Sequence, residues 1–207
     1  MIDNLKEFWY LWLIAALLLV IAVFAMKKAS AAVKKHNETM RSRDEELKRL
    51  KYLVDNYSSV TPESAQKADP CELIDGMTAV LQRKLEKSGD FNGEFESASV
   101  LEKKMYACHY FFEDVKDGKL SDWCRNNGEP LISLTFELIS DIGENKLLSV
   151  MKKMYPMFDK NDDVTSYDES RIKELDSDFS KIYSKERIAG EVRDFVVSSL
   201  SEKIELN

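Results

Sequence analysis

Residues 114–126 read Asp-Val-Lys-Asp-Gly-Lys-Leu-Ser-Asp-Trp-Cys-Arg-Asn, and they indicate how the folded part of this chain is built. Gly118 ends one predicted helix and lets the chain turn, because glycine lacks the side chain that restricts other residues. Leu120 and Trp123 are three residues apart, so they share the apolar face of a short following helix. Asn126 or its neighbour ends that helix, since asparagine tolerates left-handed backbone conformations. The segment predicts a corner between two helices with a buried inner face.

The same segment resembles a pattern of a helical domain family named after a bacterial DNA-mimic protein, DNA mimic protein nineteen. The pattern reads Glu-Val-x-Asn-Gly-Gly-Phe-x-Gln-aromatic-Phe-x-Asn. Positions that match it or resemble it are Asp114, Val115, Asp117, Gly118, Leu120, Trp123 and Asn126. Lys119, Asp122 and Cys124 depart from it. The candidate motif or interaction residues are Asp114, Asp117, Gly118, Leu120, Asp122, Trp123 and Asn126.

The surroundings extend this resemblance over about residues 73–200. An aromatic helix precedes the segment, and an apolar helix that closes in Asp141-Ile142-Gly143 follows it. Next comes a helix ending in Tyr155-Pro156-Met157-Phe158, similar to the family's Leu-Phe-Pro close. Residues 172–179 resemble its helix with the pattern Leu-Asp-x-x-aromatic. The resemblance implies a compact helical domain, mostly of unknown function, and no known reaction.

Apolar residues recur at helical spacing throughout residues 69–207, and no stretch alternates as a strand would. Asp69-Pro70 predicts a helix start, with aspartate as N-cap and proline in the first turn. A polar loop is expected at 159–166, and Ser184 is expected to cap the last helix. Helices are predicted at about 70–88, 97–115, 120–126, 130–143, 145–158, 168–183 and 186–203. We therefore predict an all-α domain over residues 69–207.

Residues 8–26, which follow a short N-terminal segment at 1–7, contain no charged side chain. As a helix they would be roughly 28 Å long, which is close to the hydrocarbon thickness of a bilayer. Trp9, Tyr10 and Trp12 gather at one end, as aromatic residues at a membrane interface do. The sequence therefore predicts a single transmembrane helix at 8–26.

Flanking charge predicts how this helix is oriented. Lys6 is the only basic residue before it, whereas Lys27, Lys28, Lys34 and Lys35 follow it closely. Basic flanks stay on the cytoplasmic side. We expect a single-pass protein of the bacterial inner (cytoplasmic) membrane, with its N-terminus outside and its C-terminal domain in the cytoplasm.

Residues 27–57 are predicted to form a basic helical stalk. Between residues 27 and 60 there are nine basic and five acidic residues. Sparse apolar residues follow steps of seven, seven, three and three, which resemble a short heptad seam: Val33, Met40, Leu47, Leu50 and Leu53. This stalk is interpreted as a solvated helix, with weak self-association or contact with anionic headgroups as alternatives. Residues 58–68 have the composition of a linker.

The chain contains none of the usual catalytic signatures. Its seven Gly are too scattered for a phosphate-binding fingerprint. Three cysteines and two histidines lack metal-ligand spacing, and Cys108 and Cys124 lie among apolar residues. His109 is the one histidine that could act as a base beside a cysteine, but no oxyanion loop accompanies it. We predict no catalytic residue, no metal and no cofactor.

Residues 61–207 carry 20 basic and 30 acidic residues, so this part is acidic while the stalk is basic. We expect a membrane-anchored, non-catalytic helical module that binds a protein partner at the cytoplasmic membrane face. Direct nucleic-acid binding is not expected, because an acidic domain repels phosphate. Two alternatives remain: an acidic regulator that mimics DNA toward a nucleic-acid-binding protein, and a membrane-tethered enzyme.

Overall fold

The computed structural model describes the backbone of residues 9–158 and 168–205. Every regular element in these ranges is a helix, which confirms the all-α fold class. The N-terminal segment 1–7 and the predicted polar loop at 159–166 lie outside the described residues. The chain divides into two compact units, Met1–Arg49 and Leu50–Asn207.

Helix α2 (Trp9–Tyr57) runs without a break through the predicted membrane segment and the predicted stalk. Exposed ion pairs with i,i+4 spacing support it, such as Arg41 with Glu45 at 3.4 Å. Among the helices that the structure describes, none is long and apolar enough to cross a membrane. The transmembrane prediction is therefore unsupported, and Phe8 and nearly all side chains of residues 9–26 lie outside the described part.

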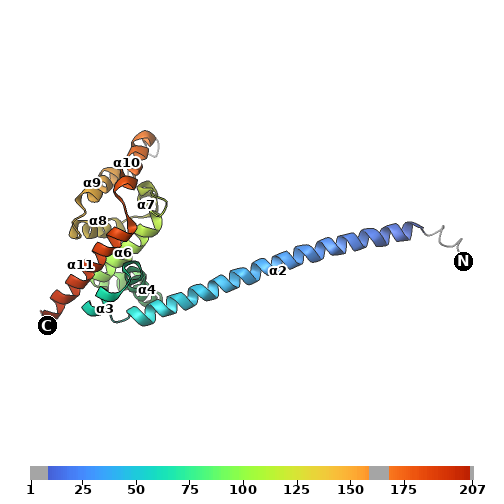
Figure 1. Ribbon diagram of the computed structural model, residues 1–207, viewed down its shortest axis with the longest axis horizontal. Coiled ribbons are helices and arrows are strands. Elements are labelled where there is room, and N and C mark those ends of the chain that lie inside the picture. The colour runs from blue at the N-terminus through green and yellow to red at the C-terminus, as the bar shows by residue number, and fades with distance from the viewer. Residues whose placement is uncertain (1–8, 159–167, 206–207) are drawn as a thin grey trace. The chain divides into compact units, whose positions relative to one another are not determined.

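The second unit is built from helices that surround one main core (Figure 1). They are α3 (Pro62–Lys67), α4 (Pro70–Ser88), α5 (Phe91–Ser97), α6 (Val100–Asp114), α7 (Leu120–Asn126), α8 (Leu131–Asp141), α9 (Asn145–Met154), the 3-10 turn η1 (Tyr155–Phe158), α10 (Glu169–Ile182) and α11 (Lys185–Glu205). Helix α6 packs against α4 and α8, α11 packs against α3 and α4, and α10 packs against α9 and α7.

Helix ends follow their local chemistry. The Asp69 side chain accepts a hydrogen bond from the Glu72 amide at 3.0 Å, and Pro70 occupies the first turn of α4, as predicted. Ser184 caps α11, because its Oγ accepts a hydrogen bond from the Arg187 amide at 3.4 Å. The predicted starts of these two helices are confirmed.

The segment predicted as a linker at 58–68 instead contains α3, whose Ala65 is fully buried in the core. Its Thr61 and Ser64 side chains form a reciprocal capping box, and Pro62 occupies the first turn. Such Ser, Thr and Pro residues are also typical of linkers, so composition alone gave the wrong interpretation here. The compact unit correspondingly begins at Leu50, before the predicted boundary at residue 69.

The helix predicted at about 97–115 is present as α6, and α5, which was not predicted, precedes it and is joined to it through Ala98 and Ser99. Asp90 caps α5, and Ser99 caps α6. Val100 shares the apolar spacing of α6, but its side chain is 61% exposed. A residue in the first turn of a helix can follow the apolar spacing and still lie outside the packed stretch.

Candidate functional site

The Asp114 carboxylate ties the end of α6 to the end of α7. It accepts hydrogen bonds from the side-chain amides of Asn126, at 3.0 Å, and of Asn127. The Asn127 amide group also donates to the Trp123 carbonyl oxygen at 3.0 Å, and Asn127 is buried. Three of these residues belong to one motif, and the structure brings them together to close the corner between the two helices.

Leu120 and Trp123 are fully buried beneath this corner. The Trp123 ring meets Phe111 of α6 edge to face, with 5.4 Å between ring centroids, and lies 6.0 Å from Phe136 of α8. Pairs of this geometry add to the free energy of burial. Both motif residues therefore contribute to the core and are inaccessible to a partner.

A carboxylate from a distant helix completes the start of α7. Lys119 stands at the N-cap position of α7 and makes no side-chain capping bond. Asp176 of α10 replaces that cap, because it accepts hydrogen bonds from the Ser121 amide at 2.9 Å and from the Ser121 Oγ at 2.7 Å. Asp176 is the aspartate of the Leu-Asp-x-x-aromatic pattern, and both its neighbours in that pattern, Leu175 and Phe179, are buried. The two sequence patterns thus meet in space.

The remaining motif residues do not converge on one site. Gly118 adopts a positive φ of 74°, which explains why the turn requires glycine. Asp122 pairs with Arg125 one helical turn later, at 3.2 Å, and Asp117 is exposed on the turn itself. The seven candidate residues therefore form a structural corner with two acidic side chains at its surface.

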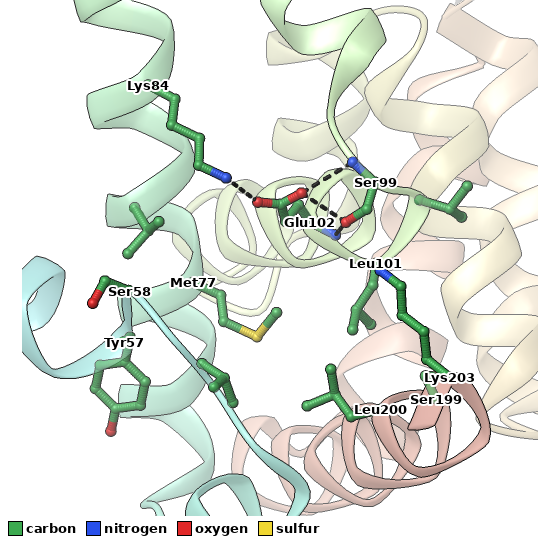
Figure 2. A pocket seen from close by; sticks show the side chains of 13 residues that line it. Tyr57, Ser58, Met77, Lys84, Ser99, Leu101, Glu102, Ser199, Leu200 and Lys203 are labelled. Atoms are coloured by element: carbon green, nitrogen blue, oxygen red, sulfur yellow. Dashed lines mark hydrogen bonds and ion pairs between the residues drawn. The ribbon is translucent and has the colours of Figure 1, made fainter. Parts of the chain in front are cut away.

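A separate groove opens at the other end of α6 (Figure 2). It encloses about 430 Å³ between the end of α2, α4, the start of α6 and the end of α11. Its apolar side chains are Val60, Met77, Val80, Val100, Leu101 and Leu200, and its other lining residues are Tyr57, Ser58, Lys84, Ser99, Glu102, Ser199 and Lys203. We call this set the groove.

Glu102 organises the polar side of the groove. Its carboxylate accepts hydrogen bonds from the Ser99 amide at 3.0 Å and Ser99 Oγ at 2.7 Å, and it pairs with Lys84 of α4 at 2.6 Å (Figure 2). Burial alone would raise the pKa of Glu102, but the hydrogen bonds from Lys84 and Ser99 outweigh it and hold that pKa below its ordinary value. This rim is therefore charged and fixed in place at neutral pH.

Gly76 positions the opposite wall. A Cβ atom built on Gly76 would lie 2.2 Å from the Tyr57 ring, so only glycine lets that ring lie against α4. The Tyr57 hydroxyl donates to the Glu72 carboxylate at 2.9 Å. Burial and this carboxylate raise the pKa of Tyr57, so the phenol stays protonated. The chain that leaves α2 is thereby held beside Met77 and Val80.

The sequence did not predict the groove, because its walls come from segments that lie far apart along the chain. One signal was available: Ser99-Val100-Leu101-Glu102 has the spacing of a capping box directly before an apolar run. That pattern marks the start of α6 correctly. The capping pattern does not show which other helices pack near the start of α6 or where a groove lies between them.

His109 and the cysteines lie outside the groove lining. His109 Nδ1 is 2.9 Å from the Asp75 carboxylate, and both side chains are about one quarter exposed. Burial raises the pKa of the Cys124 thiol to about 12 and that of the Cys108 thiol further, so both are held as neutral thiols. Within the described residues, no three His, Cys, Asp or Glu side chains gather where a metal could bind.

Comparison with known proteins adds one match. The model of the DMP19-like protein family matches residues 96–199, which is half of the chain. This range begins later than the resemblance that starts at residue 73, and it contains the α6–α7 corner and Asp176. Curated proteins and solved structures gave no match. The chain belongs to the DMP19-like protein family.

Proposed function

We propose that the protein is a membrane-anchored, non-catalytic module that binds an apolar segment of a protein partner in the groove at the cytoplasmic membrane face. The groove is the observation that carries this proposal. Its floor is apolar, its rim is held by the Lys84–Glu102 ion pair, and Val100 is 61% exposed at its edge. An open apolar floor with a fixed polar rim is typical of a binding surface.

The anchor rests on the sequence of residues 8–26, which contains no charge, and on the four lysines that follow it. An anchor of this kind restricts the domain to the membrane surface. It raises the effective concentration toward any partner held at the same surface. A groove of modest size is then sufficient for specific binding.

Charge distribution favours this function over DNA mimicry. Several acidic side chains of the domain are paired with cations, as Lys104 is with both Glu137, at 3.5 Å, and Asp141, at 2.6 Å. Other acids pair within or between helices, such as Glu102 with Lys84. Interleaved charges neutralise each other at short range, whereas a DNA backbone presents one sign of charge continuously.

Site-specific photocrosslinking tests whether a protein partner binds in the groove. A photoreactive phenylalanine analogue at Val100 is compared with the same analogue at Phe91, which is 52% exposed but lies outside the groove lining. We expect one defined protein adduct from position 100 in intact cells, lost on Leu200→Lys, and none from position 91. The same adduct from both positions, or one that Leu200→Lys leaves unchanged, would contradict binding in the groove.

Membrane fractionation tests the anchor separately. We expect the full chain to resist alkaline carbonate extraction, and a variant with Leu17→Lys and Val20→Glu to be extracted. Protease added to intact spheroplasts should leave the C-terminal domain uncut, and should cut it once the cells are lysed. Extraction of the unchanged chain would overturn the anchor and leave the groove experiment valid.

A further inference from the structure

Helix α2 carries an unpartnered apolar stripe. Val33 is 58% exposed, Met40 44% and Leu47 64%, although all three are large apolar side chains. They recur at intervals of seven residues in one continuous helix. Seven residues make nearly two helical turns, so the three side chains lie on one face.

The ion pairs of the same stretch lie on another face. Lys34 pairs with Glu38 at 4.0 Å, and Arg41 pairs with Glu45 at 3.4 Å. When Val33 and Met40 are placed at heptad position a, these charged residues take positions b and f, away from the seam. The helix therefore has apolar side chains at the a positions of the seam and ion pairs on the opposite face, while the d positions hold His36, Arg43 and Leu50.

We propose that this stripe is the seam of a parallel, in-register pair formed with a second copy of the chain. In that arrangement Met40 meets Met40 of the other copy. Arg43 takes position d, so the two Arg43 side chains face each other, and Asp44 takes position e, where the carboxylate of each copy lies beside the guanidinium of the other and offsets this like charge. The reciprocal Arg43–Asp44 contact gives this pair its charge complementarity, and it does not depend on the groove or the anchor.

Cysteine crosslinking of the full chain in mild detergent tests the register. Val33→Cys, Met40→Cys and Leu47→Cys are oxidised one at a time, with unchanged chain as baseline and Ser42→Cys, an exposed position off the seam, as matched control. We expect a covalent dimer from each seam position and none from Ser42→Cys. An antiparallel pair could crosslink efficiently at one seam position at most. Crosslinking at a single seam position, equal crosslinking at Ser42→Cys, or no crosslinking at all would each overturn the proposal.

Charge exchange tests the partner contact. Arg43→Glu places like charges together across the seam, and adding Asp44→Arg restores opposite charges with the same composition. Sedimentation should show that Arg43→Glu weakens the dimer by about tenfold and that the double variant regains most of it. Equal weakening by the single and double variants would overturn the Arg43–Asp44 contact.

Discussion

Side-chain carboxylates accept hydrogen bonds at both ends of α6, but the apolar side chains beside the two ends differ in how exposed they are. At its C-terminal end, Asp114 holds Asn126 and Asn127, while Asp176 caps α7 nearby. At its N-terminal end, Glu102 holds Ser99 and Lys84 at the rim of the groove. Carboxylates secure both ends, but the groove opens beside the N-terminal end, whereas the apolar motif residues at the C-terminal end, Leu120 and Trp123, are buried.

This difference separates what identifies the family from what is available to a partner. The motif residues secure the corner, and their apolar members are buried. The groove takes one wall from within the matched range, at Ser99–Glu102, and another from α4, before residue 96. Substitutions at the corner should therefore change stability, whereas substitutions at the groove should change binding.

Trp123→Ala should have the largest effect on stability. It empties a fully buried site between Phe111 and Phe136 and should cost about 3–5 kcal/mol of unfolding free energy. Urea denaturation followed by circular dichroism measures this loss. Val100→Ala at the open end serves as the matched control and should change stability by less than about 0.5 kcal/mol. Equal losses would break the distinction between the two ends.

Asp176→Ala should have the next largest effect. It leaves the Ser121 amide and hydroxyl without their acceptor and should cost about 1–3 kcal/mol. Asp178→Ala, two residues along the same helix, removes only an exposed ion pair with Lys181 and should cost at most about 1 kcal/mol. The ranking is tested in the same denaturation experiment, and a larger loss for Asp178→Ala would refute the capping role of Asp176.

Gly118→Ala should cost about 1–2 kcal/mol, because φ is 74° there and L-residues are disfavoured in that region. The added Cβ would be 3.8 Å from the Ser180 side chain, so the cost is in the backbone and involves no clash. Gly190→Ala in α11 should change stability in the opposite direction, since a Cβ there meets nothing within 4 Å and alanine favours helix. The melting temperature should fall for Gly118→Ala and rise for Gly190→Ala.

The smallest expected effect concerns pH at the groove. Because the folded pKa of Glu102 is lowered from 4.5, its contribution to stability is present above that pH and is lost as pH falls through the folded pKa. Glu102→Gln should therefore have a flatter stability profile below pH 4.5 than the unchanged chain. Lys84→Met removes a hydrogen bond that lowers this pKa, so the loss should begin at higher pH. Identical profiles in all three chains would contradict the role of Glu102.

Much of the fold could be predicted because its signals are local. Asp69-Pro70 marks a helix start, Gly118 marks a stop, and the three-residue spacing of Leu120 and Trp123 marks a buried face. These features depend on backbone conformation and periodicity within a few residues. Helix α3 was missed, because its Thr-Pro-x-Ser cap has the same composition as a linker.

The groove and the Asp176 contact could not be predicted in the same way. Asp176 lies 55 residues from Ser121, and the groove joins Tyr57 to Lys203. Such proximity depends on how whole helices pack, which local spacing does not specify. The sequence predicted the corner and the buried face of Leu120 and Trp123, but it could not predict that Asp114 would bind Asn126 across the corner or that Asp176 would cap α7.

The burial of Cys108 and Cys124 provides a built-in reporter of unfolding. Maleimides react with accessible thiols, so a maleimide should modify the half-buried Cys71 first and reach the other two only when the domain opens. The rate at which the second and third labels are added, followed by mass spectrometry, then measures opening of the native domain without denaturant. Because Cys108 lies in α6 and Cys124 in α7, equal rates would show that the two helices open as one cooperative unit.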